Sequence, residues 1–272
     1  MEHDLRQREL RLASITNMFT KAPSTQQAEY TFTISARGKL PNTPVFAFLR
    51  HQFGNVPLGQ IESLFGFVER STLYGGRGFV RRELSDRDVL QLNNAGIGLR
   101  IPMSNHHATR AEYEQNIELL RKYCRKGNSI IATNDDLARW VRQDFPEYRL
   151  DASVIKNINN KRKLDQALEI YDEIVLPMKS NEDLEFLSTI DEKDRITLFA
   201  NAGCAFTCPS KTCYASVSKF NKGKGNTELQ CSQSLKERET LGMIDFDLQQ
   251  LNDLGFHSFK LLRARQGQLT GF

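Results

Sequence analysis

The stretch SIIATNDDLARWVRQDFPEYRLDASV, residues 129–154, places an apolar run, a helical segment and a second apolar run in direct succession. Ser129–Asp135 is predicted to be a strand, DLARWVRQDF a helix and Tyr148–Val154 the next strand. A strand, a helix and a strand in this order are typical of a parallel βα unit.

The same alternation continues on both sides of residues 129–154. Further strands are expected at Leu64–Arg70, Ile97–Met103, Glu173–Lys179, Arg195–Gly203 and His257–Arg265. One of two early stretches, TFTISARG or VFAFLR, should supply the first strand. The total of about eight strands is the number that closes a (β/α)8 TIM-type barrel, which takes about 250 residues. A doubly wound sheet is the alternative, but no G-x-G-x-x-G follows an early strand.

Helix boundaries are marked by residues that commonly start or stop helices. Ser85, Thr109 and Asn181 are expected to cap the helices that follow them, because their side chains can accept a hydrogen bond from a backbone N–H in the first turn. Gly96 and Gly255 are expected to end helices.

The chain is predicted to be one barrel domain, residues 30–272, preceded by an amphipathic helix and a polar linker, residues 1–29. Its 272 residues are 39% hydrophobic and 26% charged, as in an ordinary soluble domain. No apolar stretch approaches the ~20 residues of a membrane span. The net charge of +4 permits an acidic partner such as RNA without demanding one.

Four of the five cysteines lie in one loop, residues 201–231, directly after the expected seventh strand. Cys204, Cys208 and Cys213 have C-x3-C-x4-C spacing, and Cys231 follows. Four thiolates hold an iron–sulfur cluster or a structural zinc ion, and the ligand type alone does not decide between them. Disulfides are disfavoured because MEHDLRQREL has no signal-peptide core, so a reducing, cytoplasmic location is expected.

The spacing is one residue longer than the C-x3-C-x2-C motif of radical S-adenosylmethionine enzymes. Those enzymes carry their motif after the first strand, whereas only 41 residues follow Cys231 here. This position disfavours that class of enzyme.

Other candidate groups follow expected strands and would face the same end of a barrel. The candidate catalytic residues are His106, His107, Asp135, Arg263 and Arg265. The alternatives are a loop position for the histidines and a helix-capping position for Asp135. Cys124 is expected to be an ordinary helix residue. Lys211, Lys219, Lys222 and Lys224 form a basic run that could meet RNA phosphates, but a solvated glycine-rich loop is the favoured interpretation.

The order of these parts resembles collagenase-like peptidase family U, which includes oxygen-independent hydroxylases of RNA and of ubiquinone precursors. The resemblance covers roughly residues 64–265. It rests on FANAGCAFTC after the seventh strand, on the scattered cysteines, on LNDLGFHSFK and on FKLLRAR, which is similar to the family's F-K-I-E-G-R. Leu262 stands where the family has an acidic residue.

The resemblance implies that Cys204, Cys208, Cys213 and Cys231 bind a 4Fe–4S cluster. It also implies a hydroxylase-like activity on RNA or on a small aromatic or quinone precursor, with a partner protein of the same family. A collagenase-like peptidase and a non-catalytic protein with a structural four-cysteine metal site are the alternatives. Neither a G-x-S-x-G nor an H-E-x-x-H motif is present to support a peptidase.

Overall fold

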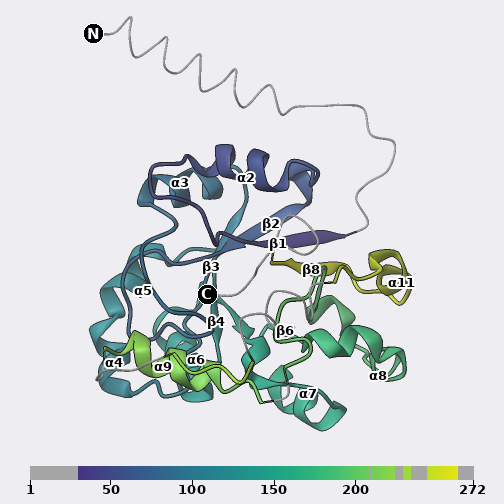
Figure 1. The fold of residues 1–272 in the computed structure, drawn as a ribbon. Helices are drawn as coiled ribbons and strands as arrows, with labels where there is room; N and C mark the ends of the chain where they lie inside the picture. The colour runs from purple at the N-terminus through teal and green to yellow at the C-terminus, as the bar shows by residue number, and fades with distance from the viewer. Residues whose placement is uncertain (1–29, 209, 224–228, 234–243, 263–272) are drawn as a thin grey trace, which may run out of the picture.

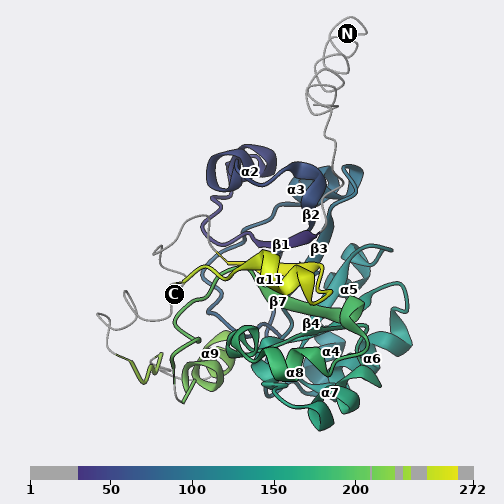
Figure 2. The same ribbon diagram turned by 90° about the vertical axis from the view of Figure 1, so that its right-hand side faces the viewer.

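Eight parallel strands close into a barrel in a computed structural model that describes residues 30–208, 210–223, 229–233 and 244–262. The strands follow one another around the barrel in chain order, and β1 pairs with both β2 and β8. The helices lie around the outside of the strands (Figure 1, Figure 2). The predicted (β/α)8 barrel is therefore confirmed, whereas the predicted helix in residues 1–20 lies outside the described residues.

The strands are short and lie deep in the molecule. They are β1 Thr31–Ser35, β2 Ile61–Phe65, β3 Gly98–Ile101, β4 Ser129–Ala132, β5 Arg149–Ala152, β6 Glu173–Val175, β7 Ile196–Phe199 and β8 Ser258–Leu261. The α-helices described are α2 Val45–Phe53, α3 Asp86–Asn94, α4 Arg110–Gln115, α5 Ile117–Tyr123, α6 Asp135–Asp144, α7 Lys161–Leu168, α8 Leu184–Ser188, α9 Cys213–Asn221 and α11 Leu248–Asp253. Short 3-10 helices are η1 Leu58–Gln60, η2 Val154–Lys156, η3 Met178–Glu182 and η4 Lys193–Arg195.

Of the two early candidates for the first strand, TFTIS forms β1 and VFAFLR begins helix α2. The buried residues of α2 are Val45, Phe48, Leu49 and Phe53, a spacing of three and four that places them on one face of a helix. The second strand lies earlier than predicted, at Ile61–Phe65. Its Glu62 interrupts the apolar run and hides the strand from a hydrophobicity pattern.

Two of the three predicted helix caps are confirmed. The Ser85 and Thr109 hydroxyls accept from the backbone N–H groups of Asp88 and Glu112, completing capping boxes. The prediction for Asn181 is wrong, because Asp183 caps α8 instead. The Asn181 amide donates a 2.7 Å hydrogen bond to the carbonyl of the last residue of β7 and is therefore engaged by the barrel.

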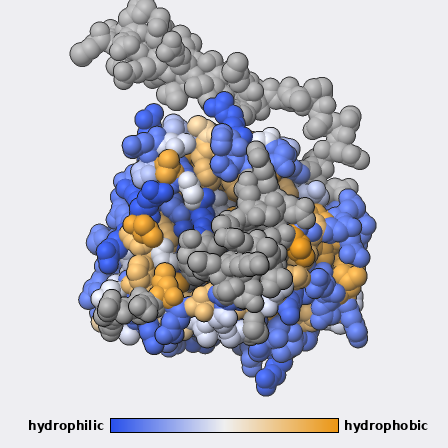
Figure 3. Space-filling view, in the orientation of Figure 1, coloured by the Kyte–Doolittle hydropathy of each residue, from blue (hydrophilic) through white to orange (hydrophobic). Residues whose placement is uncertain are grey.

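The described surface is mainly hydrophilic on the face shown in Figure 3, with smaller hydrophobic areas between the polar ones. This agrees with helices that turn one apolar side toward the strands; α6, for example, buries Leu137, Ala138 and Val141. Among the described helices, none is both long and apolar enough to cross a membrane.

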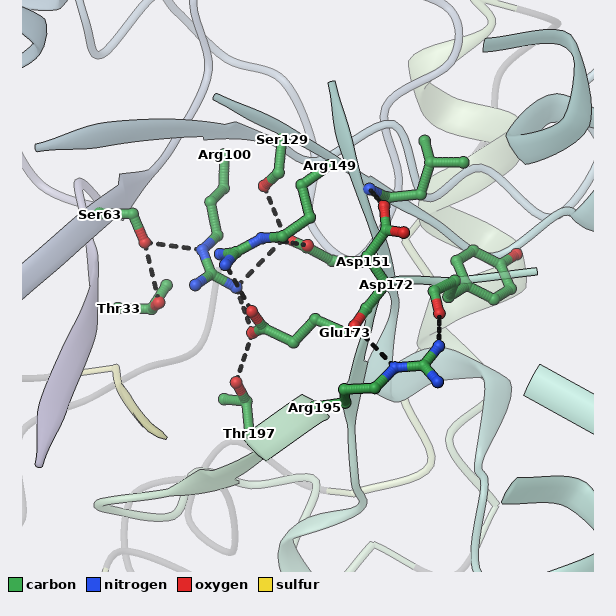
Figure 4. Close-up of polar contacts among 12 residues, drawn as sticks. Thr33, Ser63, Arg100, Ser129, Arg149, Asp151, Asp172, Glu173, Arg195 and Thr197 are labelled. Atoms are coloured by element: carbon green, nitrogen blue, oxygen red, sulfur yellow. Dashed lines mark hydrogen bonds and ion pairs between the residues drawn. The ribbon is translucent and has the colours of Figure 1, made fainter. Parts of the chain in front are cut away.

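Buried charged side chains form an ionic layer in the barrel interior, on the side toward the amino ends of the strands. The Arg100 guanidinium on β3 is buried, and its Nε donates to the Ser63 hydroxyl at 2.6 Å. It also pairs with Asp151 on β5 at 3.2 Å and with Glu173 on β6 (Figure 4). Glu62 accepts from the same guanidinium at 2.8 Å. One arginine thus connects carboxylates from three strands.

Candidate functional site

A cavity of about 180 Å³ opens at the carboxyl end of the barrel, above the ionic layer. Ser35, Phe65 and Phe199, each the last residue of its strand, line it. The carboxyl ends of the strands are the end at which TIM-barrel enzymes carry their active sites. The cavity therefore lies where a functional site is expected in this fold.

The loop after β2 forms one wall of the cavity through Gly75 and Gly76. This loop lies against the segment after β3, where the backbone N–H of Asn105 donates to the Leu73 carbonyl at 3.0 Å. A Cβ atom at Gly75 would lie 2.1 Å from the Ser104 carbonyl oxygen. Only glycine allows the two backbones to approach this closely.

We expect Gly75→Ala to lower the free energy of unfolding by about 1–3 kcal/mol, because the added methyl group meets backbone atoms that cannot rotate away. Urea titration measures the change. Gly59→Ala is the matched control, since a Cβ at Gly59 meets nothing within 4 Å, and it should change stability by less than about 0.5 kcal/mol. Equal stabilities of the two variants would contradict this packing.

The four clustered cysteines all line this one cavity. After β7 the chain stays buried through Gly203, and the backbone N–H of Ala202 donates to the Ile244 carbonyl at 2.8 Å. The following turn presents Cys204 and then Cys208, Cys213 begins α9, and Cys231 is on the stretch 229–233. The structure therefore brings together the four thiols that the sequence spacing grouped.

Hydrogen bonds and burial affect these thiols in different ways. Burial opposes ionisation of Cys208, but hydrogen bonds from Ser232 and from backbone N–H groups leave its pKa below the usual value. Burial, followed by the charges of Cys204, Cys208 and Cys231, raises the pKa of Cys213 to about 11. Cys213 is therefore within electrostatic reach of the other three thiols.

The thiols are not packed around a single point. Within the described ranges, no group of three or more His, Cys, Asp or Glu side chains is arranged closely enough to hold a metal ion. A tetrahedral zinc ion needs four sulfurs at about 2.3 Å from one centre. The described side chains therefore do not form a preassembled site for a single metal ion.

The cavity is cationic as well as thiol-rich. Arg37, Arg77, Lys211 and Lys260 line it, and its described lining contains no Asp, Glu or His side chain. Arg77 is paired with Glu83, which lies outside the lining. Burial, and then the neighbouring charge of Arg77, lowers the pKa of Arg37 to about 10. These cations can offset the negative charge of thiolates or of a bound anion.

The predicted catalytic candidates lie elsewhere or outside the described residues. His106 is half-buried against α9, with its Nδ1 3.3 Å from the Ser218 hydroxyl, and burial lowers its pKa. Neither His106 nor His107 is among the residues lining the cavity. Asp135 begins α6 and accepts from the Lys156 ammonium at 2.6 Å and the Tyr171 hydroxyl at 2.7 Å. Arg263 and Arg265 lie outside the described residues.

The segment expected to be a solvated basic loop instead contains helix α9. Ser218 and Asn221 are buried on it, and the Asn221 amide donates to the carbonyls of Tyr74 and Arg77 at 3.0 Å. Lys222 is paired with Glu112 at 2.7 Å. The basic run therefore does not present all its charges to solvent, and Lys224 is not among the described residues.

Lys260 and Arg37 are cavity residues that the sequence reasoning did not assign to the site. Alternation along the last strand separates Lys260 from Phe259, and closure of the barrel then puts Lys260 in register with Thr33 on β1 and Phe199 on β7. A lysine at an interior position is uncommon enough to indicate a role.

No protein-family model matches this sequence, and no curated protein does. A solved structure described as that of the U32 peptidase Mk0906 aligns with it at a TM-score of 0.56 and 11% sequence identity. The alignment covers 90% of this chain and 98% of the other. At that identity the likeness concerns the fold, so this chain has the same barrel fold as the U32 peptidase over most of its length.

Proposed function

We propose that this chain is an iron–sulfur protein that binds a 4Fe–4S cluster through Cys204, Cys208, Cys213 and Cys231 at the open end of its barrel. The observation that carries the proposal is that the four thiols line one cavity. In a four-iron cluster each thiolate binds a different iron, so the sulfurs need to surround a volume rather than a single ion. Thiols that line the walls of one cavity could meet this requirement.

The residues around the thiols suit a buried redox centre with an adjacent small molecule. The cluster would supply one-electron chemistry when bound. Arg37 and Lys211 would offset the negative charge of the thiolates, while Phe65 and Phe199 give the floor an apolar surface. A small aromatic compound would meet such a floor, which supports a hydroxylase-like activity on a small aromatic or quinone precursor.

RNA is the other substrate expected from the sequence. The structure offers fewer basic contacts for it than the sequence suggested, because Lys222 is paired with Glu112 and Lys211 turns to the cavity. We therefore favour the small aromatic substrate.

The name of the structurally similar protein favours a second candidate, a peptidase. Peptide hydrolysis by a cysteine or a water nucleophile commonly uses a histidine or carboxylate base. The described lining of the cavity contains neither. A peptidase would therefore need a histidine or carboxylate base from residues other than the described lining of the cavity.

The iron–sulfur proposal predicts that protein purified without oxygen is brown and contains about four irons and four acid-labile sulfides per chain. The measurement is iron, zinc and sulfide analysis, together with the visible absorption spectrum. Stoichiometric zinc without iron would instead indicate a structural site in which four cysteines bind one ion. Hydrolysis of gelatin peptides by metal-free protein would support the peptidase.

A further inference from the structure

Lys260 is a buried lysine whose amine reaches the cavity from below. It is the third residue of β8 and is only 6% exposed. Its Nζ lies 4.2 Å from the centre of the Phe65 ring, and both residues line the cavity. The amine therefore lies at the boundary between the ionic layer and the open end of the barrel.

The Lys260 amine has no hydrogen-bond acceptor or paired carboxylate among the described residues, and it lies over the face of the Phe65 ring. Lys39 is also buried but shows the usual arrangement. Its Nζ pairs with Asp88 at 2.8 Å and donates to the carbonyls of Leu40 and Glu83 at 3.2 and 3.1 Å. A buried lysine without such partners is costly to keep charged, so its presence calls for a functional explanation.

The surroundings of Lys260 resemble those that make lysines nucleophilic. A lysine amine is activated when it is desolvated or lies near another cation. Lys260 meets both conditions, because it is buried and because the Arg100 guanidinium acts on it from the layer below.

We propose that Lys260 is a nucleophilic amine that forms an imine with a small aldehyde or ketone bound in the cavity. The nitrogen lone pair attacks the carbonyl carbon, and the π electrons of the carbonyl move to its oxygen. The oxygen takes up the two protons that the nitrogen gives up and leaves the carbinolamine as water. A C=N bond remains. No oxidant or reductant is consumed.

The protonation state of Lys260 and the size of the cavity agree with this role. Burial, and then Arg100, lowers the pKa of Lys260 to about 8, while Asp151 and Glu173 oppose the shift. A useful fraction of the amine is therefore neutral near pH 8. A cavity of about 180 Å³ is below the ~300–1,000 Å³ of drug-sized pockets, so it suits a small carbonyl compound.

The test is reductive trapping of the purified protein with limiting propanal and sodium cyanoborohydride at pH 7.5, followed by peptide mapping. The secondary amine should form at Lys260 about tenfold faster than at the exposed Lys161, because the hydrogen bond with Asp165 raises the pKa of Lys161 and keeps its amine almost wholly charged at that pH. Butanone, as a ketone, should give the same preference. Lys39 should stay unmodified, because its amine is fully buried as well as paired with Asp88.

Lys260→Met is the matched variant, since it keeps an unbranched side chain of similar length and removes the amine. It should abolish labelling at that peptide and leave the rate at Lys161 unchanged. Labelling of wild-type Lys260 that is no faster than that of Lys161 would overturn the proposal, whatever the variant does. The result is independent of the cysteines, so the iron–sulfur proposal and this one can fail separately.

Discussion

Replacing Arg100 by Met should lower the free energy of unfolding by about 3–5 kcal/mol, because it leaves buried carboxylates without their cation. Arg100 is fully enclosed and is bonded to Asp151, Glu173 and Glu62. Met fills much of the same volume but donates no hydrogen bond. Urea titration at pH 7 measures the loss, and a change below about 1 kcal/mol would show that Arg149 alone suffices to hold these carboxylates.

An exposed ion pair provides the control for this experiment. Arg121 pairs with Glu118 on the surface of α5, and Arg121→Ala should change the free energy of unfolding by less than about 1 kcal/mol. Comparing the two variants therefore separates the cost of leaving buried charges unpaired from the small effect of losing an exposed ion pair.

The cost of Arg100→Met should also decrease at acid pH. Burial raises the pKa of Asp151 to about 6, so Asp151 takes up a proton first. Burial opposes ionisation of Glu173, but Arg100 and Arg149 lower its pKa to about 2 in the folded protein. Ionised Glu173 therefore stabilises the wild type at pH values above about 4.3, the pKa of a glutamate in the unfolded chain. This stabilisation is lost as the pH falls toward 2. Between pH 7 and pH 3 the stabilities of wild type and variant should converge.

The barrel could be predicted from sequence because each βα unit carries local signals. The apolar runs mark the strands, and Ser85 and Thr109 mark helix starts through contacts within one helical turn. The polar barrel interior could not be predicted in this way. Arg100 and Asp151 sit inside short strands, and which side of a strand faces the interior is decided only when all eight strands close.

The candidate site was predicted in part for the same reason. Four cysteines close in sequence indicate a shared centre without knowledge of the fold, whereas Lys260 gains its meaning only from neighbours on other strands. Helix α9 was missed because the segment is rich in serine, lysine and asparagine, which have no strong helical signal together. Its buried Asn221 shows that tertiary hydrogen bonds to the loop after β2 hold the helix in place.

Replacing Cys213 by Ser should remove most of the iron from anaerobically purified protein, from about four irons per chain to less than about one. Cys213 lies at the first position of α9, in the cavity and within electrostatic reach of the other three thiols. Serine has almost the same size as cysteine, so the fold should persist while a soft thiolate ligand is lost. Iron and sulfide analysis measures the change, and circular dichroism verifies that the barrel remains folded.

Cys124→Ser is the matched control, because it makes the same chemical change at a cysteine remote from the cavity. Cys124 follows the end of α5 and packs against the hydrophobic core. It should keep the full iron content and the visible spectrum. Iron loss in Cys124→Ser, or its retention in Cys213→Ser, would show that the thiols at the barrel opening are not the ligands. Loss in Cys213→Ser alone would assign the metal to the cavity, because the two variants differ in the position of the thiol and not in the chemistry of the substitution.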